Sequence, residues 1–118
     1  GFTTIEVGIH NPEAPDRYRN IKLVADTGAM YSVIPANILN ELGIKLLSKR
    51  RFTLANGETI ERDIGGALYR VGEYGGHAPI IFGEEGDRWL LGVTALEAMG
   101  LQVDPVSQQL KPIELLLL

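Results

Sequence analysis

Apolar and polar residues alternate over several short stretches of the chain, and a period of two is the pattern of half-buried β-strands. The first such stretch, residues 3–10, places isoleucine and valine side chains on one face. The polar loop 11–16 then reverses the chain. The same pattern predicts strands over residues 18–25, 67–71 and 78–82, with Gly75-Gly76 as the turn between the last two.

Residues 52–61 carry the signature of a β-hairpin. Two strand-like segments, 52–55 and 58–61, flank the dipeptide Asn56-Gly57. This dipeptide is strongly preferred in tight two-residue turns because both of its residues tolerate positive φ angles. Short strands at this spacing, with only two helical segments, predict an all-β barrel or sandwich.

Two apolar segments run directly into a glycine-containing turn. Each is followed by a short helical pattern, another glycine and one more apolar strand, which together make a degenerate internal repeat. The first copy comprises residues 21–25, Asp26-Thr27-Gly28, a helix over 35–42 and a strand over 43–46. The second copy comprises residues 89–91, Gly92, a helix over 94–99 and a strand over 100–103.

Asp26 is the main candidate for chemistry, because an apolar strand delivers its carboxylate into a turn. A carboxylate in apolar surroundings is costly unless hydrogen bonds compensate. Asp26 is therefore either a structural turn residue or a catalytic acid and base. Asp, Thr and Gly all favour turns, so the triplet by itself supports both interpretations.

The composition limits the class of protein. The chain has 118 residues, 45% of them hydrophobic, and no long glycine- or proline-rich linker, so we expect a single domain over residues 1–118. The absence of cysteine excludes disulfides, thiolate metal sites and a cysteine nucleophile. The net charge of -4 argues against nucleic acid as a partner. No stretch approaches the roughly 20 apolar residues of a membrane helix, so we expect no membrane segment.

Other catalytic chemistries find few residues to carry them. His10 and His77 do not stand in a metal-ligand spacing with carboxylates, and the serines lack the Gly-x-Ser-x-Gly context of a nucleophile elbow. The paired glycines lack the spacing of a nucleotide-binding fingerprint. We therefore expect neither a metal nor another cofactor. The compartment stays open, with the cytoplasm slightly favoured.

Taken together, these motifs resemble those of the retropepsin-like aspartic proteases. That family carries two apolar residues and a spacer before Asp-Thr-Gly-Ala, and later an apolar-apolar-Gly motif followed by a helix. The corresponding residues here are Asp26-Thr27-Gly28-Ala29 and Leu90-Leu91-Gly92. The resemblance covers nearly the whole chain and implies the closed acid-protease barrel with one or two short helices.

The resemblance also implies roles for individual residues. Asp26 is the expected catalytic residue, and the 52–60 hairpin is the expected flap that closes over substrate. The expected active-site loop is Thr27, Gly28 and Ala29, the flap tip Leu54, Ala55, Asn56 and Gly57, and the supporting second motif Leu90, Leu91 and Gly92. We expect extended peptides with bulky hydrophobic side chains as substrates.

An aspartic mechanism needs two carboxylates that share one proton around a water molecule. The chain has a single Asp-Thr-Gly, so the second carboxylate must come from a symmetric homodimer. Retroviral members commonly carry an Asp and an Arg that form a salt bridge near the dimer interface, where this chain has Met30 and Val93. The dimer must therefore be held differently, and the chain looks closer to cellular and bacterial members. The terminal strands 3–10 and 109–116 could pair between subunits.

Two functional hypotheses follow. The first is a homodimeric aspartic endopeptidase with an acidic to mildly acidic pH optimum. The second is a non-catalytic module of the same fold that binds peptides or dimerises and retains Asp26 only for the turn. Cleavage of peptides, and its loss in Asp26→Asn, separates the two.

Overall fold

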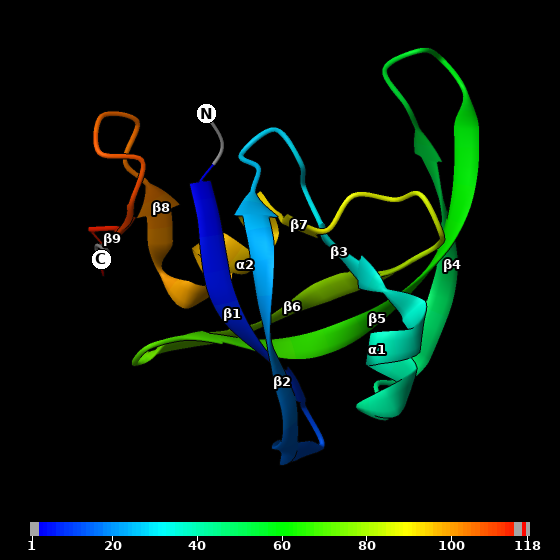
Figure 1. The fold of residues 1–118 in the computed structure, drawn as a ribbon, viewed down its shortest axis with the longest axis horizontal. Coiled ribbons are helices and arrows are strands. Elements are labelled where there is room, and N and C mark those ends of the chain that lie inside the picture. Colours follow the sequence, from blue (N-terminus) through cyan, green and yellow to red (C-terminus); the bar gives the residue numbers. More distant parts are fainter. Residues whose placement is uncertain (1–2, 115–116, 118) are drawn as a thin grey trace.

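The computed structural model describes residues 3–114 and residue 117, and strands dominate it (Figure 1). The strands are β1 (Thr3–Asn11), β2 (Ala14–Ala25), β3 (Ser32–Pro35), β4 (Leu46–Thr53), β5 (Thr59–Val71), β6 (Tyr74–Gly83), β7 (Leu90–Leu91), β8 (Leu101–Val103) and β9 (Leu110–Pro112). The helices are α1 (Ala36–Glu41) and α2 (Val93–Met99). Within this described part of the chain, neither helix has the length and apolar character needed to cross a membrane.

Seven strands form one sheet in the order β1-β2-β7-β3-β6-β5-β4. β1 also pairs with β5, where Ile9 lies opposite Tyr69, so six strands close into a ring and β4 extends from β5 outside it. Figure 1 shows β1 and β2 crossing the long strands β5 and β6. β8 and β9 form a separate two-stranded sheet. The prediction of an all-β fold with two short helices is confirmed.

The hydrophobic core is built from alternate residues of the ring strands and from one side of each helix. Val7 and Ile9 of β1, Leu23 of β2 and Ile80 of β6 are fully buried. The helices contribute Ile38, Leu39, Ala95, Leu96 and Met99. Each fully buried aliphatic side chain of this size contributes roughly 1.5–3 kcal/mol. The apolar side chains that alternate along the strands are therefore the ones that pack against the helices.

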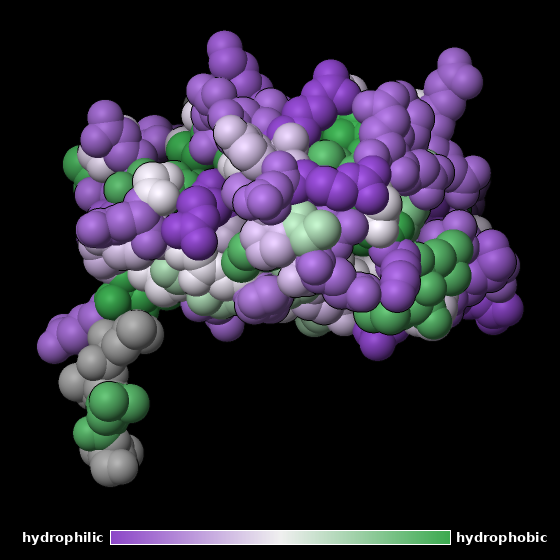
Figure 2. All heavy atoms as spheres, turned by 90° about the horizontal axis from the view of Figure 1, so that it is seen from below, coloured by the Kyte–Doolittle hydropathy of each residue, from purple (hydrophilic) through white to green (hydrophobic). Residues whose placement is uncertain are grey.

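Exposed apolar side chains interrupt a mainly hydrophilic surface. Figure 2 shows this for one face, where hydrophilic residues dominate and apolar patches are separate. The large apolar side chains that are exposed are Tyr18, Met30, Leu46, Leu47, Leu54, Trp89, Val106 and Leu117. Met30 and Leu54 also line a pocket that is described below.

The segment after the first helix differs from the prediction. Instead of starting a strand at residue 43, the chain completes the end of α1: Gly43 adopts a positive φ of 73° and its N–H donates to the carbonyl of Asn40 at 3.0 Å. Such a left-handed glycine is a common helix C-terminus. Strand β4 then begins at Leu46. β3, which the repeat did not predict, precedes α1.

The predicted hairpin is confirmed, and its turn is of another type. β4 and β5 pair in antiparallel fashion up to Thr53 opposite Thr59. The Gly57 N–H donates to Leu54 O at 2.9 Å and the Leu54 N–H donates to Glu58 O at 2.8 Å, so three residues form the loop. Gly57 has a φ of 88°, whereas Asn56 is not among the residues with positive φ. The prediction of a two-residue Asn-Gly turn is therefore wrong: the loop has three residues and ends in a glycine with a left-handed conformation.

The predicted turn at Gly75-Gly76 is also wrong. β5 and β6 pair up to Val71 opposite Tyr74, so the chain turns at Gly72 and Glu73. Gly76 lies inside β6, where a β-carbon would collide with the backbone of Ala98 in α2. This glycine serves close packing of a helix on a strand, a role that composition alone does not distinguish from a turn.

The predicted C-terminal strand over 109–116 is shorter in the structure. β9 ends at Pro112 and pairs with β8 of the same chain, with Leu101 opposite Pro112. Residues 115 and 116 of that prediction lie outside the described residues. Pairing of terminal strands between subunits stays a prediction.

Candidate active site

Asp26 stands where β2 ends against β7. The two strands pair in parallel, with Ala25 opposite Leu91. The Asp26 N–H donates to the Leu91 carbonyl at 3.0 Å, which extends the pairing by one residue. Asp26 is half-buried, because the strand that carries it leaves the core at this point.

The turn after Asp26 is organised around its own carboxylate. The Gly28 N–H donates to Asp26 Oδ1 at 2.9 Å, and the Ala29 N–H donates to the Asp26 carbonyl at 3.1 Å. Asp and Asn commonly stabilise turns in this way. Thr27 and Gly28 are exposed, so the predicted active-site loop is open to solvent beside the carboxylate.

The second repeat holds this loop from behind. The Val93 N–H donates to Ala29 O at 2.9 Å, and Thr94 donates to Met30 O from its N–H at 3.0 Å and from its hydroxyl at 2.6 Å. Gly92 lies so close to this segment that a β-carbon would come within 2.5 Å of the Tyr31 carbonyl carbon. The two copies of the repeat are therefore interlocked by backbone contacts.

The three residues of the second motif have different structural roles. Leu91 is fully buried in the core, Gly92 permits the close approach just described, and Leu90 lines a pocket. Sequence reasoning grouped them as one supporting motif. The structure brings all three next to the Asp26 loop.

Ser32 belongs to this site and was missed by the sequence analysis, which considered serines only as nucleophiles. Its fully buried hydroxyl accepts a hydrogen bond from the Gly92 N–H at 2.9 Å. It also contacts Tyr69, whose phenol donates to Pro79 O at 2.8 Å. Burial raises the pKa of Tyr69, and the contact with Ser32 acts in the opposite direction, so Tyr69 remains neutral at ordinary pH. A polar residue inside an apolar run was the signal available.

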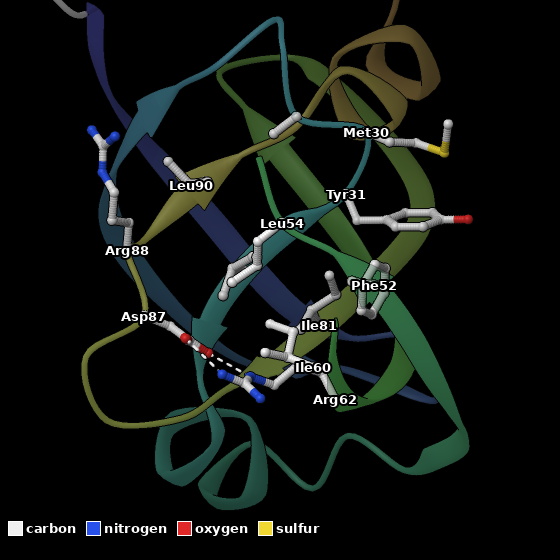
Figure 3. Close-up of a pocket in the computed structure, with 12 residues that line it drawn as sticks. Met30, Tyr31, Phe52, Leu54, Ile60, Arg62, Ile81, Asp87, Arg88 and Leu90 are labelled. Atoms are coloured by element: carbon white, nitrogen blue, oxygen red, sulfur yellow. Dashed lines mark hydrogen bonds and ion pairs between the residues drawn. The ribbon is translucent and has the colours of Figure 1, made fainter. Parts of the chain in front are cut away.

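An apolar pocket of about 480 Å³ adjoins the active-site loop (Figure 3). It lies between that loop, the β4–β5 hairpin, β6 and the segment leading into β7. Its lining residues are Ala29, Met30, Tyr31, Val33, Phe52, Leu54, Ile60, Arg62, Ile81, Asp87, Arg88 and Leu90. The pocket thus brings together one residue from each predicted group: Ala29, Leu54 and Leu90.

Not every predicted residue lies at this pocket. Asp26 and Thr27 line a second cavity of about 290 Å³ with residues of β1, β8 and the loop that follows β8. Ala55, Asn56 and Gly57 are exposed in the hairpin loop, and Leu54 is the predicted flap residue that lines the apolar pocket. Asp26 therefore lines the second cavity, while the apolar pocket begins three residues further on, at Ala29.

Tyr31 connects the active-site loop to the hairpin, a link that the sequence did not indicate. Its hydroxyl accepts a hydrogen bond from Arg50 Nη1 at 2.8 Å, and the Arg50 guanidinium lies 5.8 Å from the centre of its ring. The Tyr31 ring meets Phe52 edge to face, with 6.1 Å between ring centres. Both partners lie on β4, which leads to the hairpin loop.

An ion pair lies at one end of the apolar pocket. Arg62 binds the carboxylate of Asp87 through two nitrogens, with Nε to Oδ2 at 2.7 Å and Nη2 to Oδ1 at 2.9 Å (Figure 3). The hydrogen bond from Arg62 is the main cause that lowers the pKa of Asp87, and the same bond raises the pKa of Arg62. Both side chains therefore stay charged at neutral and mildly acidic pH.

Comparison with known proteins places these features in context. A family model described as Aspartyl protease matches residues 16–95. The solution structure of the simian foamy virus (mac) protease is similar, with a TM-score of 0.50 and 18% identity over 80% of this chain and 91% of that one. The crystal structure of a retropepsin-like aspartic protease from Rickettsia conorii is similar, with a TM-score of 0.51 and 25% identity over 88% of this chain and 85% of that one. No curated protein matches the chain.

Proposed function

Because this chain belongs to the aspartyl protease family, we propose that it is an aspartic endopeptidase whose active form is a homodimer. The observation that carries the proposal is the setting of Asp26. One carboxylate oxygen accepts a hydrogen bond from the Gly28 N–H at 2.9 Å, in a loop fixed by Leu91 and open to solvent. A carboxylate that is held in place and accessible is suited to proton transfer.

A second subunit is required because the chemistry needs two carboxylates. The chain contains one Asp-Thr-Gly, and the second repeat has Leu90-Leu91-Gly92 in the corresponding place. A two-fold axis beside Asp26 brings two copies of the same carboxylate together. Thr27, exposed next to Asp26, is the residue we assign to contact with the partner subunit across that axis.

Two neighbouring carboxylates share a proton because like charges disfavour double ionisation. The ionised Asp26 takes a proton from a water molecule as the water oxygen bonds to the peptide carbonyl carbon. The protonated Asp26 of the other subunit gives its proton to the carbonyl oxygen. When the resulting diol collapses, the carbon–nitrogen bond breaks and the amine takes the proton that the first Asp26 received from water. The Asp26 of the other subunit takes a proton from a diol hydroxyl, so that the product is a carboxylic acid and the dyad again holds one proton.

The apolar pocket beside the loop supports extended peptides with bulky hydrophobic side chains as substrates. Ala29, three residues after Asp26 in the sequence, lines the pocket. Leu54 lines it from the hairpin. The hairpin tip, Ala55 to Gly57, is exposed and is the part we assign to closing over the peptide. Closure excludes bulk water from the reacting groups. Gly28 leaves room for the substrate backbone next to Asp26.

The test compares wild type with Asp26→Asn on a mixed peptide library. We expect cleavage by the wild type that falls by about 10²- to 10⁴-fold in the variant, since the dyad loses its acid and base. The rate per mole of wild-type protein should fall on dilution as dimers dissociate, and the pH profile should peak at acidic to mildly acidic pH. Thermal unfolding of both proteins controls for folding.

Full-rate cleavage by Asp26→Asn would refute the mechanism. A folded dimer that binds extended peptides and leaves them intact at every pH would instead favour a non-catalytic peptide-binding or dimerisation module. Cleavage that scales linearly with concentration down to a monomeric sample would refute the shared site.

A further inference from the structure

We infer that the Arg62–Asp87 ion pair makes the apolar pocket select against charged substrate side chains, so that these two residues are specificity determinants. The inference rests on the proposed function in one respect: the pocket must receive a side chain of the peptide. Apolar walls alone disfavour charge; the inference adds that two particular residues strengthen this discrimination and that removing either one changes which sign of charge is accepted.

The pair supplies two of the three charged residues that line a mainly apolar pocket, the third being Arg88. The walls come from residues such as Phe52, Ile60, Ile81 and Leu90. The Tyr31 hydroxyl is already engaged by Arg50 at 2.8 Å. In Figure 3 Arg62 and Asp87 face each other at one end of the pocket.

Each member of the pair is already matched with partners. All three guanidinium nitrogens of Arg62 contact acceptors, because Nη1 also reaches Glu84 Oε2 at 2.9 Å and Glu61 O at 2.8 Å. Both oxygens of Asp87 accept from Arg62, and Oδ2 also accepts from the Glu84 N–H at 2.8 Å. The side chains of Arg62 and Asp87 are only 15% and 23% exposed.

This arrangement penalises either sign of charge on the substrate. An acidic side chain would have to displace Asp87 from Arg62, and a basic one would have to displace Arg62 from Asp87. Each exchange replaces one ion pair by another and leaves a half-buried charge without its partner, which is unfavourable. An uncharged side chain leaves the pair intact and gains apolar contact with the walls.

Other charges near the pocket are more exposed. The Glu84 side chain is 62% exposed, so solvent screens it more strongly than the pair. Arg88 is exposed and, in Figure 3, extends away from the Arg62–Asp87 pair. Charge discrimination inside the pocket therefore depends mainly on the pair.

Single substitutions should reverse the rule in opposite directions. Asp87→Asn removes the carboxylate that occupies Arg62 and makes the guanidinium available to an acidic side chain. Arg62→Gln leaves the Asp87 carboxylate available to a basic one. The double variant, Arg62→Gln with Asp87→Asn, has neither charge and should again prefer uncharged side chains.

The experiment measures binding rather than cleavage, in the Asp26→Asn background, with a fluorescent peptide library that varies one position at a time. For one position of the peptide, we expect peptides with leucine or methionine there to bind at least about tenfold more tightly than peptides with glutamate or lysine. Asp87→Asn should raise the affinity for peptides with glutamate at that position by about tenfold, and Arg62→Gln should raise the affinity for peptides with lysine there by a similar factor. Asp63→Asn is the matched control: Asp63 follows Arg62 on β5 and forms an ion pair with Lys49 of β4 at 2.9 Å, but it does not line the pocket.

Each result decides the inference. Equal binding of charged and apolar side chains by the Asp26→Asn protein, absence of peptide binding, or unchanged preferences in folded Asp87→Asn or Arg62→Gln would overturn it. If both single variants fail to fold, Arg62→Lys takes their place: it keeps the charge but loses the two-nitrogen contact with Asp87, so it should weaken the discrimination against charged side chains, and an unchanged preference would overturn the inference. Charge selection in binding, together with a wild type that cleaves no peptide, would support the inference and refute the proposed protease activity.

Discussion

Ser32 illustrates how much a single buried hydroxyl can matter beside a functional loop. Its oxygen accepts the hydrogen bond of the Gly92 N–H at 2.9 Å, and Ser32 is fully buried. A buried donor without an acceptor costs more than the net value of the hydrogen bond it loses. The cohesion of the two repeats therefore depends on a side chain that takes no part in the chemistry.

We predict that Ser32→Ala lowers the free energy of unfolding by roughly 1–3 kcal/mol, because it leaves the Gly92 N–H buried and unpaired. Urea unfolding at one fixed protein concentration measures this. Ser48→Ala, at an exposed position of β4, is the matched control and should change stability by less than about 0.5 kcal/mol. Ser32→Thr keeps the hydroxyl and should recover part of the loss. Equal stability of Ser32→Ala and wild type would contradict the assignment.

At the scale of elements, the β4–β5 hairpin is linked to the active-site loop through one aromatic residue. Tyr31 contacts both Arg50 and Phe52 on β4, while the hairpin loop beyond Thr53 is exposed. An exposed loop with few buried contacts opens locally at low cost. The resting position of the hairpin therefore depends on how firmly its strand is held at Tyr31.

We predict that Tyr31→Phe increases hydrogen exchange of the Leu54 and Gly57 amides by about fivefold, because the Arg50 hydrogen bond contributes about 1 kcal/mol. Both amides are hydrogen-bonded within the hairpin, so their exchange reports its opening. Tyr18→Phe provides the control, since Tyr18 stacks on His10 in another part of the fold. Exchange that is unchanged in Tyr31→Phe, or equally faster in both variants, would show that Tyr31 does not restrain the hairpin.

The elements also show which features a sequence can reveal. Most of the strands, the hairpin and the two helices follow from local periodicity, although β3 does not, and the family prediction is confirmed because its motifs are contiguous. Turn type was wrong at Asn56-Gly57 and turn position was wrong at Gly75-Gly76, because a glycine serves turns, bulges and close packing alike. Arg62 with Asp87 and Tyr31 with Arg50 escaped prediction, since the order of strands in the sheet decides which distant residues meet.

At the scale of the whole molecule, a change in pH affects both the stability of the fold and the proposed reaction. Asp87 fastens the segment before β7 to β5, and its pKa is held below the ordinary aspartate value, mainly by the hydrogen bond from Arg62. A lowered pKa in the folded state means that the ion pair stabilises the fold fully above the unfolded-state pKa of about 3.9. That contribution is lost as the pH falls further, through the folded-state pKa.

We predict that wild type is more stable than Asp87→Asn by roughly 1–3 kcal/mol between about pH 5 and pH 7. The difference should shrink below about pH 4, because the unfolded chain takes up a proton at this residue there while the lowered pKa keeps Asp87 ionised in the folded protein. Denaturant unfolding of both proteins across this range measures the effect. A difference that grows as the pH falls would have the wrong sign for a lowered pKa. The mildly acidic range proposed for catalysis therefore leaves the pocket intact.

The interlocked repeats also set an order in time. Ser32 meets Gly92 60 residues further along the chain, and Met30 meets Thr94 64 residues further on. Contacts between such distant segments form late in folding, because closing a long loop costs entropy before the contact repays it. During synthesis the ribosome releases the Asp26 turn well before the residues that fasten it. A nascent or truncated chain ending before residue 90 thus carries the carboxylate without its support, and chain completion itself controls when the site is assembled.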